Sequence, residues 1–151
     1  MKNTKNMFLA VTLLLSVGMM HAAEYSYTGQ AAVDHLIETG ECRKCDLSGQ
    51  DLRDAIAAIK SRDPYYKIDL SGANLTGTDL RNADLWNADL FLVNLSNANL
   101  SYANLCRANL IGADLDEANL SDANLSYANL CMARLRYTTL HGANLTGTYV
   151  R

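Results

Sequence analysis

The sequence predicts an all-β solenoid, in which short extended segments alternate with tight turns. From Leu70 onward leucine recurs every five residues, through sixteen leucines, and Val150 takes the next place. A small residue, usually alanine, stands two positions before most of these leucines, and glycine or asparagine is common two positions after them. This regular order predicts one local structure that is repeated along the chain.

A period of five residues fits neither an α-helix nor a flat strand. A helix would spread such leucines around all its faces, and a strand would alternate them between two faces. A short extended segment followed by a corner does fit, because the small residue and the leucine, two positions apart, both point inward. Glycine and asparagine suit the corner since they tolerate positive φ. Pro64 is the only proline, so each repeat backbone keeps the N–H group that pairs with a neighbouring coil.

The repeats resemble those of the pentapeptide-repeat family, whose motif reads A-(D/N)-L-x-x. Residues 83–87 (ADLWN) and 98–102 (ANLSY) both match it. The resemblance covers residues 68–151 without a break and residues 47–52 in part. It implies a right-handed quadrilateral β-helix with four repeats per coil, hence about four full coils stacked at roughly 4.8 Å.

Residues 24–67 are expected to form an N-terminal cap with a partial first coil and a helical insertion. Residues 30–38 (QAAVDHLIE) have the apolar spacing of a short helix that Gly40 would end. Residues 51–62 (DLRDAIAAIKSR) read as a helical insertion that ends before Pro64. Between them, residues 46–49 (DLSG) repeat the sequence of residues 69–72, which indicates an early partial coil.

Residues 1–23 have the features of a secretory signal peptide. Lys2 and Lys5 precede a mainly apolar run over residues 7–20, and Ala22 or Ala23 would precede the cleavage site. That run is shorter than the roughly 20 residues that a membrane-spanning helix needs. We therefore expect a periplasmic or secreted bacterial protein with no stable membrane insertion after the signal is removed.

Cys42-x-x-Cys45 is the only cysteine motif. Haem attachment would need a histidine at position 46, zinc would need two further ligands, and a thioredoxin-like site would need a βαβ context. Both cysteines fall on inward positions that flank a corner, so we expect a structural disulfide; buried free thiols and a redox or metal role are the alternatives. Cys106 and Cys131 are 25 residues apart, on adjacent faces, and are expected to stay free.

No sequence pattern indicates catalysis, so we expect no enzyme activity, cofactor or metal. The chain lacks a nucleophile elbow, a zinc-protease motif and a phosphate loop. Calcium binding by the aspartates of the first full coil is the alternative, but outward side chains on different faces diverge. The net charge of −3 has the wrong sign for phosphate binding, so no nucleic-acid partner is expected. The aspartates concerned are Asp69, Asp79, Asp84 and Asp89.

A 20-residue coil would place residues of successive coils in columns. Two neighbouring columns on one face carry outward apolar side chains and form a stripe that is a candidate surface for a protein partner or self-association; packing beneath the N-terminal segment is the alternative. The final coil has no cap in the sequence, which predicts a second surface and a homodimer through that coil. The same register predicts the ion pairs Asp114–Arg134 and Asp116–Arg136. The surface residues are Phe91, Leu92, Ile111 and Met132, with Tyr149 in the final coil.

Two classes of function follow from these observations. The first is a non-enzymatic protein-binding or structural module of the cell envelope or the secreted fraction, whose partner the sequence does not identify. The alternative comes from the resemblance, because the best-understood family members are acidic DNA mimics that bind gyrase in the cytoplasm. Those proteins have long, strongly negative solenoids, whereas this chain has a mild charge and an export signal.

Overall fold

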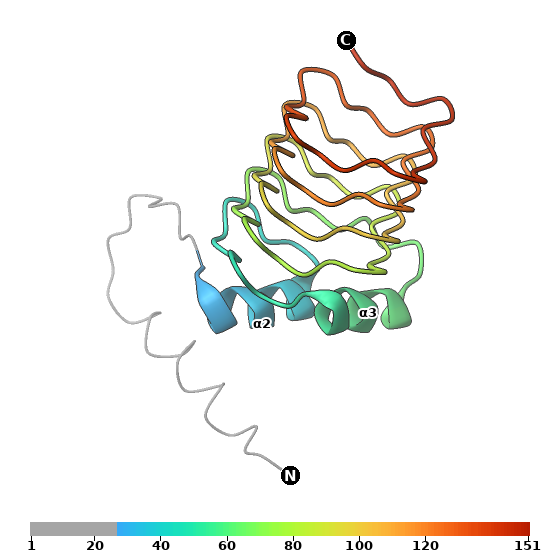
Figure 1. Cartoon of the computed structure of the whole chain (residues 1–151). Coiled ribbons are helices and arrows are strands. Elements are labelled where there is room, and N and C mark those ends of the chain that lie inside the picture. The colour runs from blue at the N-terminus through green and yellow to red at the C-terminus, as the bar shows by residue number, and fades with distance from the viewer. Residues whose placement is uncertain (1–26) are drawn as a thin grey trace, which may run out of the picture.

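The two helices lie together at one end of a stack of coils (Figure 1). The computed structural model describes residues 27–151, so the predicted signal peptide at residues 1–23 lies outside the described residues. Helix α2 spans Gly29–Thr39 and helix α3 spans Arg53–Arg62. Neither helix, nor any other in the described part of the chain, is long and apolar enough to cross a bilayer.

Parallel β-bridges stack the coils on one another. From Asp69↔Asp89 to Asn129↔Tyr149 each bridge joins residues 20 positions apart, and successive bridges are five residues apart. Four bridged segments, beginning with the one at Asp69, therefore make one four-sided coil. Within residues 27–151 the bridges stay isolated and do not extend into long strands, because the chain turns a corner after each short segment.

Each corner is a β-turn with a left-handed third residue. In the turn after Leu70, the Ala73 N–H donates to the Leu70 carbonyl oxygen at 3.0 Å, and Gly72 has a φ of 66°. A positive φ at the third residue is the mark of a type II turn, where glycine and asparagine carry the lowest conformational cost. Asn82 and Asn87 occupy the same place with φ of 59° and 56°.

The inward side chains form one continuous apolar core. Every repeat leucine from Leu70 to Leu125 is 0 % exposed, and the small residues paired with them are also buried. Backbone hydrogen bonds run between coils beside this core, for example from the Leu90 N–H to the Asn109 carbonyl oxygen at 2.9 Å. Leucine and alanine thus fill the interior while the backbone satisfies its own polar groups.

The N-terminal end of the core is covered by α2 and α3. Helix α2 buries Ala32 and Leu36, and it ends where the Gly40 N–H donates to the Leu36 carbonyl oxygen at 2.8 Å with a φ of 73°. Helix α3 buries Ile56 and Ile59. Both helices differ by one or two residues from the predicted bounds; α3 begins later because Asp51 is still part of a bridge, to Asp79.

The first coil has three bridged sides. Its bridges, Glu41↔Asp69, Asp46↔Asn74 and Asp51↔Asp79, join residues 28 apart, because the chain between Asp51 and Asp69 includes α3. A further bridge joins Thr28 to Asp46, so the chain just before α2 adds a segment beneath this coil. That segment could not be predicted from the sequence, since it lies outside the five-residue repeat.

The Lys60 side chain links the end of α3 to the loop that leads into the solenoid. Its ammonium donates to the carbonyl oxygens of Pro64 at 3.2 Å and Tyr66 at 2.9 Å, and lies 5.9 Å from the centre of the Trp86 ring. Burial lowers the pKa of Lys60. A lysine in this position holds the loop that leads from α3 back into the repeats.

Candidate interaction surfaces

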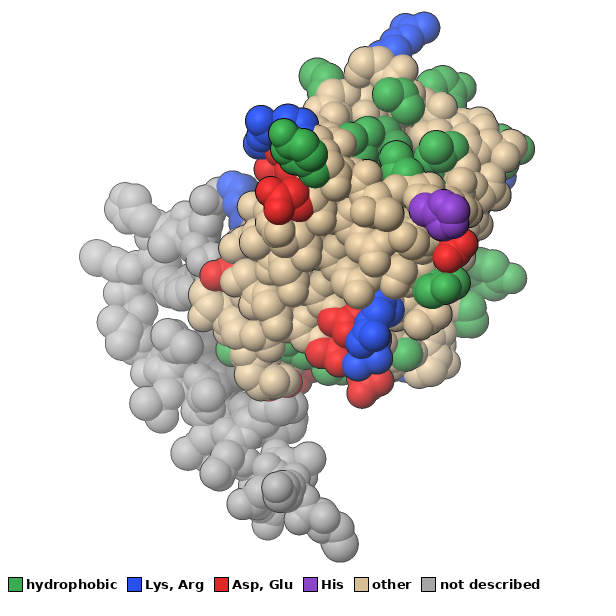
Figure 2. All heavy atoms as spheres, in the orientation of Figure 1, with side chains coloured by type: hydrophobic (Ala, Val, Ile, Leu, Met, Phe, Trp, Pro, Cys, Tyr) green, Lys and Arg blue, Asp and Glu red, His purple; other side chains and the backbone are tan. Residues whose placement is uncertain are grey.

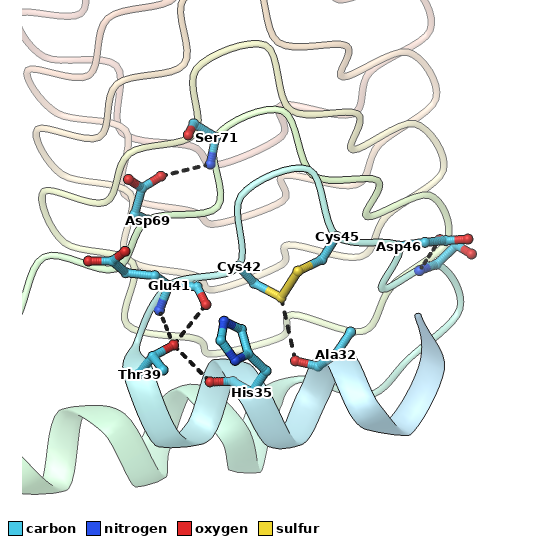
Figure 3. The surroundings of a disulfide bond; sticks show 10 residues. Ala32, His35, Thr39, Glu41, Cys42, Cys45, Asp46, Asp69 and Ser71 are labelled. Atoms are coloured by element: carbon cyan, nitrogen blue, oxygen red, sulfur yellow. Dashed lines mark hydrogen bonds between the residues drawn. A yellow bond between two sulfur atoms is a disulfide. The ribbon is translucent and has the colours of Figure 1, made fainter. Parts of the chain in front are cut away.

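The corner formed by residues 42–45 contains a disulfide bond and faces α2 (Figure 3). Cys42 and Cys45 are bonded with their Cα atoms 5.4 Å apart, and each residue is only 1 % exposed. The Cys42 sulfur lies 3.5 Å from the Ala32 carbonyl oxygen of α2. A disulfide this buried stabilises the corner against the helix and offers no sulfur for exchange with a solvent thiol.

The described residues offer no metal site. Within residues 27–151 no three His, Cys, Asp or Glu side chains are grouped so that they could hold a metal ion. Each aspartate considered for calcium has a protein partner instead: Asp69 pairs with Arg43 at 2.6 Å, and Asp79 with Arg81 at 2.6 Å. The hydrogen bond from the Arg81 side chain lowers the pKa of Asp79. The other two pair with Lys67 (Asp89) and with Asn104 (Asp84).

One corner of the solenoid carries a line of apolar side chains, here called the corner ridge: Phe91, Leu92, Ile111, Cys131 and Met132. The register is set by the Leu92 N–H, which donates to the Ile111 carbonyl oxygen at 3.0 Å, and by Gly112, which donates to Cys131 at 2.9 Å. Phe91 is 41 % exposed, Leu92 56 % and Met132 73 %. The structure therefore brings the predicted stripe together in two neighbouring columns on one corner and leaves much of it open to solvent.

The final coil exposes the end of the apolar core. Leu125 is fully buried, but the equivalent residue one coil later, Leu145, is 44 % exposed, and Val150 is 64 % exposed. Tyr149, the remaining predicted surface residue, is 65 % exposed beside them. Figure 2 shows hydrophobic side chains gathered at the C-terminal end of the solenoid. This coil thus presents side chains of the kind that every earlier coil buries.

The outer edge of the final coil also carries unpaired backbone groups. One coil earlier, the Leu115 and Leu125 N–H groups donate to the carbonyl oxygens of the coil that follows, at 2.9 and 2.8 Å. The corresponding N–H groups of Leu135 and Leu145 have no backbone acceptor among residues 27–151. Such an edge can pair with another chain.

Ion pairs connect the inner edge of the final coil to the coil that precedes it. Arg134 contacts Asp114 at 3.0 Å and also Asp116, and Arg136 contacts Asp116 at 2.6 Å. The Arg136 N–H donates to the Asp116 carboxylate at 2.9 Å, and the hydrogen bonds from Arg136 lower the pKa of Asp116. Both predicted ion pairs are confirmed, so the final coil is anchored on one side and open on the other.

Comparison with known proteins shows the family. The family model for pentapeptide repeats matches in eight copies, over residues 68–99, 88–126 and 113–150. No curated protein is significantly similar in sequence.

Three solved structures show the range of similarity. The pentapeptide repeat protein Rfr23 of Cyanothece is 31 % identical, with 82 % of this chain and 100 % of that chain covered and a TM-score of 0.34. HetL of Nostoc, a pentapeptide repeat protein involved in heterocyst differentiation regulation, is 36 % identical over 72 % of this chain, with a TM-score of 0.37. The match covers 48 % of HetL, so this chain spans about half its length.

The third structure supports the fold alone. The pentapeptide repeat protein alr5209 of Nostoc has a TM-score of 0.53, with 85 % of this chain and 100 % of that chain covered at 23 % identity. The family match, the five-residue period and the 20-residue bridges agree with one another. The chain belongs to the pentapeptide-repeat family, whose members form right-handed quadrilateral β-helices and are generally structural or binding proteins rather than enzymes.

Proposed function

We propose that the chain is a non-enzymatic protein-binding module of the bacterial envelope that associates with a second copy of itself through its final coil. The observation that carries this proposal is the end of the apolar core, where Leu145 and Val150 are 44 % and 64 % exposed. Covering these side chains removes apolar surface from water, which is the main driving force of protein association. A partner with the same edge would also supply backbone groups to the unpaired N–H groups there.

A second copy meets both requirements at once. It has the same exposed side chains and the same open edge, and a two-fold axis would cover both ends in a single contact. The Asp116 ion pairs keep the coil in place before the contact forms, so less ordering is needed on association. The exposed ring of Tyr149 adds an aromatic side chain of the kind that is enriched in interfaces.

Light scattering over a range of protein concentrations tests this contact. Val150→Asp places a charge in the proposed interface at a side chain whose exposure leaves the fold intact, and is expected to weaken association at least about tenfold. Tyr102→Asp is the matched control, because Tyr102 is 62 % exposed on a middle coil. A wild-type protein that stays monomeric at every concentration, or equal effects of both substitutions, would contradict the proposal.

A location outside the cytoplasm is supported by two independent features. The sequence of residues 1–23 has the order of charges and apolar residues typical of a signal peptide. The Cys42–Cys45 disulfide suits an oxidising compartment. The intact mass of the protein recovered from the cell envelope or the medium is expected to begin at Ala23 or Glu24; a full-length protein confined to the cytoplasm would contradict export.

The alternative of a gyrase-binding DNA mimic is less well supported. Such a mimic needs rows of uncompensated carboxylates, whereas six aspartates of this solenoid lie within ion-pair distance of arginine or lysine. Purified protein that inhibits gyrase supercoiling and remains in the cytoplasm would favour the mimic over the envelope module. The six are Asp51, Asp69, Asp79, Asp89, Asp114 and Asp116.

A further inference from the structure

We propose that the corner ridge adsorbs the protein to the surface of a lipid bilayer that contains anionic lipids. This contact is distinct from the one at the final coil, since it uses one corner along the length of the solenoid. It is reversible adsorption of side chains, with no spanning segment. Adsorption through the ridge does not require the self-association proposed above.

Two turn positions of the ridge hold long apolar side chains. Leu92 and Met132 have φ values of 54° and 58°, in the left-handed region that disfavours long side chains. On other corners the same turn position, with the same left-handed backbone, holds residues such as Asn82, Arg107 and Glu117. The backbone conformation is therefore a property of the repeat, and the ridge differs from those positions because it presents apolar side chains to solvent, with Leu92 56 % and Met132 73 % exposed.

The size of the ridge argues against a protein partner. Its five residues follow a single corner over three coils, a length of roughly 10–15 Å at the usual spacing between strands. A stable protein interface buries about 800 Å² on each partner, far more than one line of side chains provides. A bilayer surface needs no matching groove, and it accepts a few apolar side chains projecting from a convex corner.

Positive charges stand at both ends of this column. The Lys44 N–H donates to the Ser71 carbonyl oxygen below the ridge, and Met132 donates to Arg151 above it, which places Arg43, Lys44 and Arg151 on the same corner. The corner positions themselves hold no acidic residue. On the face before the corner, Asp69 pairs with Arg43, Glu41 lies beside Arg43 and Asp89 pairs with Lys67; on the face after it, Asp114 pairs with Arg134. Apolar side chains flanked by lysine and arginine are typical of surfaces that bind anionic membranes.

The two free cysteines allow a test that separates the ridge from every other part of the chain. Cys131 lies in the ridge and Cys106 lies on another corner, and both are partly exposed. A polarity-sensitive fluorophore is attached to Cys131 in Cys106→Ser, and to Cys106 in Cys131→Ser. Each labelled protein is mixed with phosphatidylcholine vesicles, with or without phosphatidylglycerol. We expect a blue shift and increased emission at Cys131 and no change at Cys106, with a stronger response on the anionic vesicles.

Substitutions that restore ordinary repeat residues complete the test. Phe91→Ser, Leu92→Asn and Met132→Asn together are expected to reduce vesicle partitioning at least about tenfold, since three exposed apolar side chains are lost. Tyr102→Asn is the control, because Tyr102 has a φ of 61° on a different corner. No response at Cys131, equal responses at both cysteines, or a triple variant that alters self-association and not partitioning would overturn the proposal.

Discussion

The leucines of one column should differ sharply in their contribution to stability. Leu125 and Leu145 occupy the same position in successive coils, but Leu125 is 0 % exposed and Leu145 is 44 % exposed. The comparison is between Leu125→Ala and Leu145→Ala, measured in solution dilute enough to keep the protein monomeric. The two substitutions remove the same atoms, so any difference in the free energy of unfolding reflects the surroundings.

The magnitudes follow from burial. Removing a fully buried leucine side chain beyond Cβ loses the transfer free energy and leaves a cavity, which together cost about 2.7–5 kcal/mol. At Leu145 little more than half of the side chain is covered, and the space left behind is open to water. Its loss should cost about 1 kcal/mol, since each buried methylene contributes about 0.8 kcal/mol and no cavity forms.

Urea unfolding followed by circular dichroism measures both values, and Trp86, the only tryptophan, reports on the N-terminal half by fluorescence. A cost at Leu145 that equals the cost at Leu125 in dilute solution would show that the final coil is covered within the monomer, and would refute the reasoning. Raising the protein concentration should increase the cost at Leu145 alone, because a second copy then covers that side chain.

Three further predictions concern the disulfide of the N-terminal cap, the pH dependence of stability in acid and the corner ridge. Thiol counting on the denatured, unreduced protein should find two free thiols, and a count of four would contradict the disulfide. The double substitution Cys42→Ser and Cys45→Ser should lower the free energy of unfolding by about 2 kcal/mol, the loop-closure value for so short a loop. The hydrogen bond from the Arg53 side chain lowers the pKa of Asp51 to about 2. The stabilisation from this hydrogen bond is therefore present above about pH 4 and is lost as the pH falls toward 2. NMR titration of the Asp51 carboxyl group should show a midpoint near 2 in the wild type, and the midpoint should rise toward about 4 in Arg53→Gln. Leu92→Asn should raise the free energy of unfolding by up to about 1 kcal/mol, because asparagine tolerates the φ of 54°; a clear loss in urea unfolding would show that Leu92 stabilises the coil.

The repeats could be predicted from the sequence because one local rule acts many times. Each leucine must point inward, so the period of five fixes the corners, and the 20-residue column then follows for any four-sided coil. That column was enough to predict the contacts of Arg134 with Asp114 and of Arg136 with Asp116, and to bring Phe91 and Met132 to one corner.

The parts outside the repeat were harder to predict, because their positions depend on tertiary contacts. The amino-acid pattern around Thr28 gives no sign that this residue forms a bridge with Asp46. Lys60 lies four residues after Ile56, on the apolar face of its helix, where a charged side chain is not expected; it is 8 % exposed because the carbonyl oxygens of the returning loop accept hydrogen bonds from its ammonium group. The degree to which Leu145 and Val150 are exposed likewise required the structure.

The most direct test of the account is amide hydrogen exchange at the outer edge of the final coil, measured at low and high protein concentration. The Leu135 and Leu145 N–H groups have no backbone acceptor among the described residues, whereas the Leu115 and Leu125 N–H groups are hydrogen-bonded between coils. Association through this edge predicts that exchange at Leu135 and Leu145 slows as the concentration rises, while exchange at Leu115 and Leu125 stays slow throughout. Fast exchange at Leu135 and Leu145 at every concentration would contradict the proposed contact.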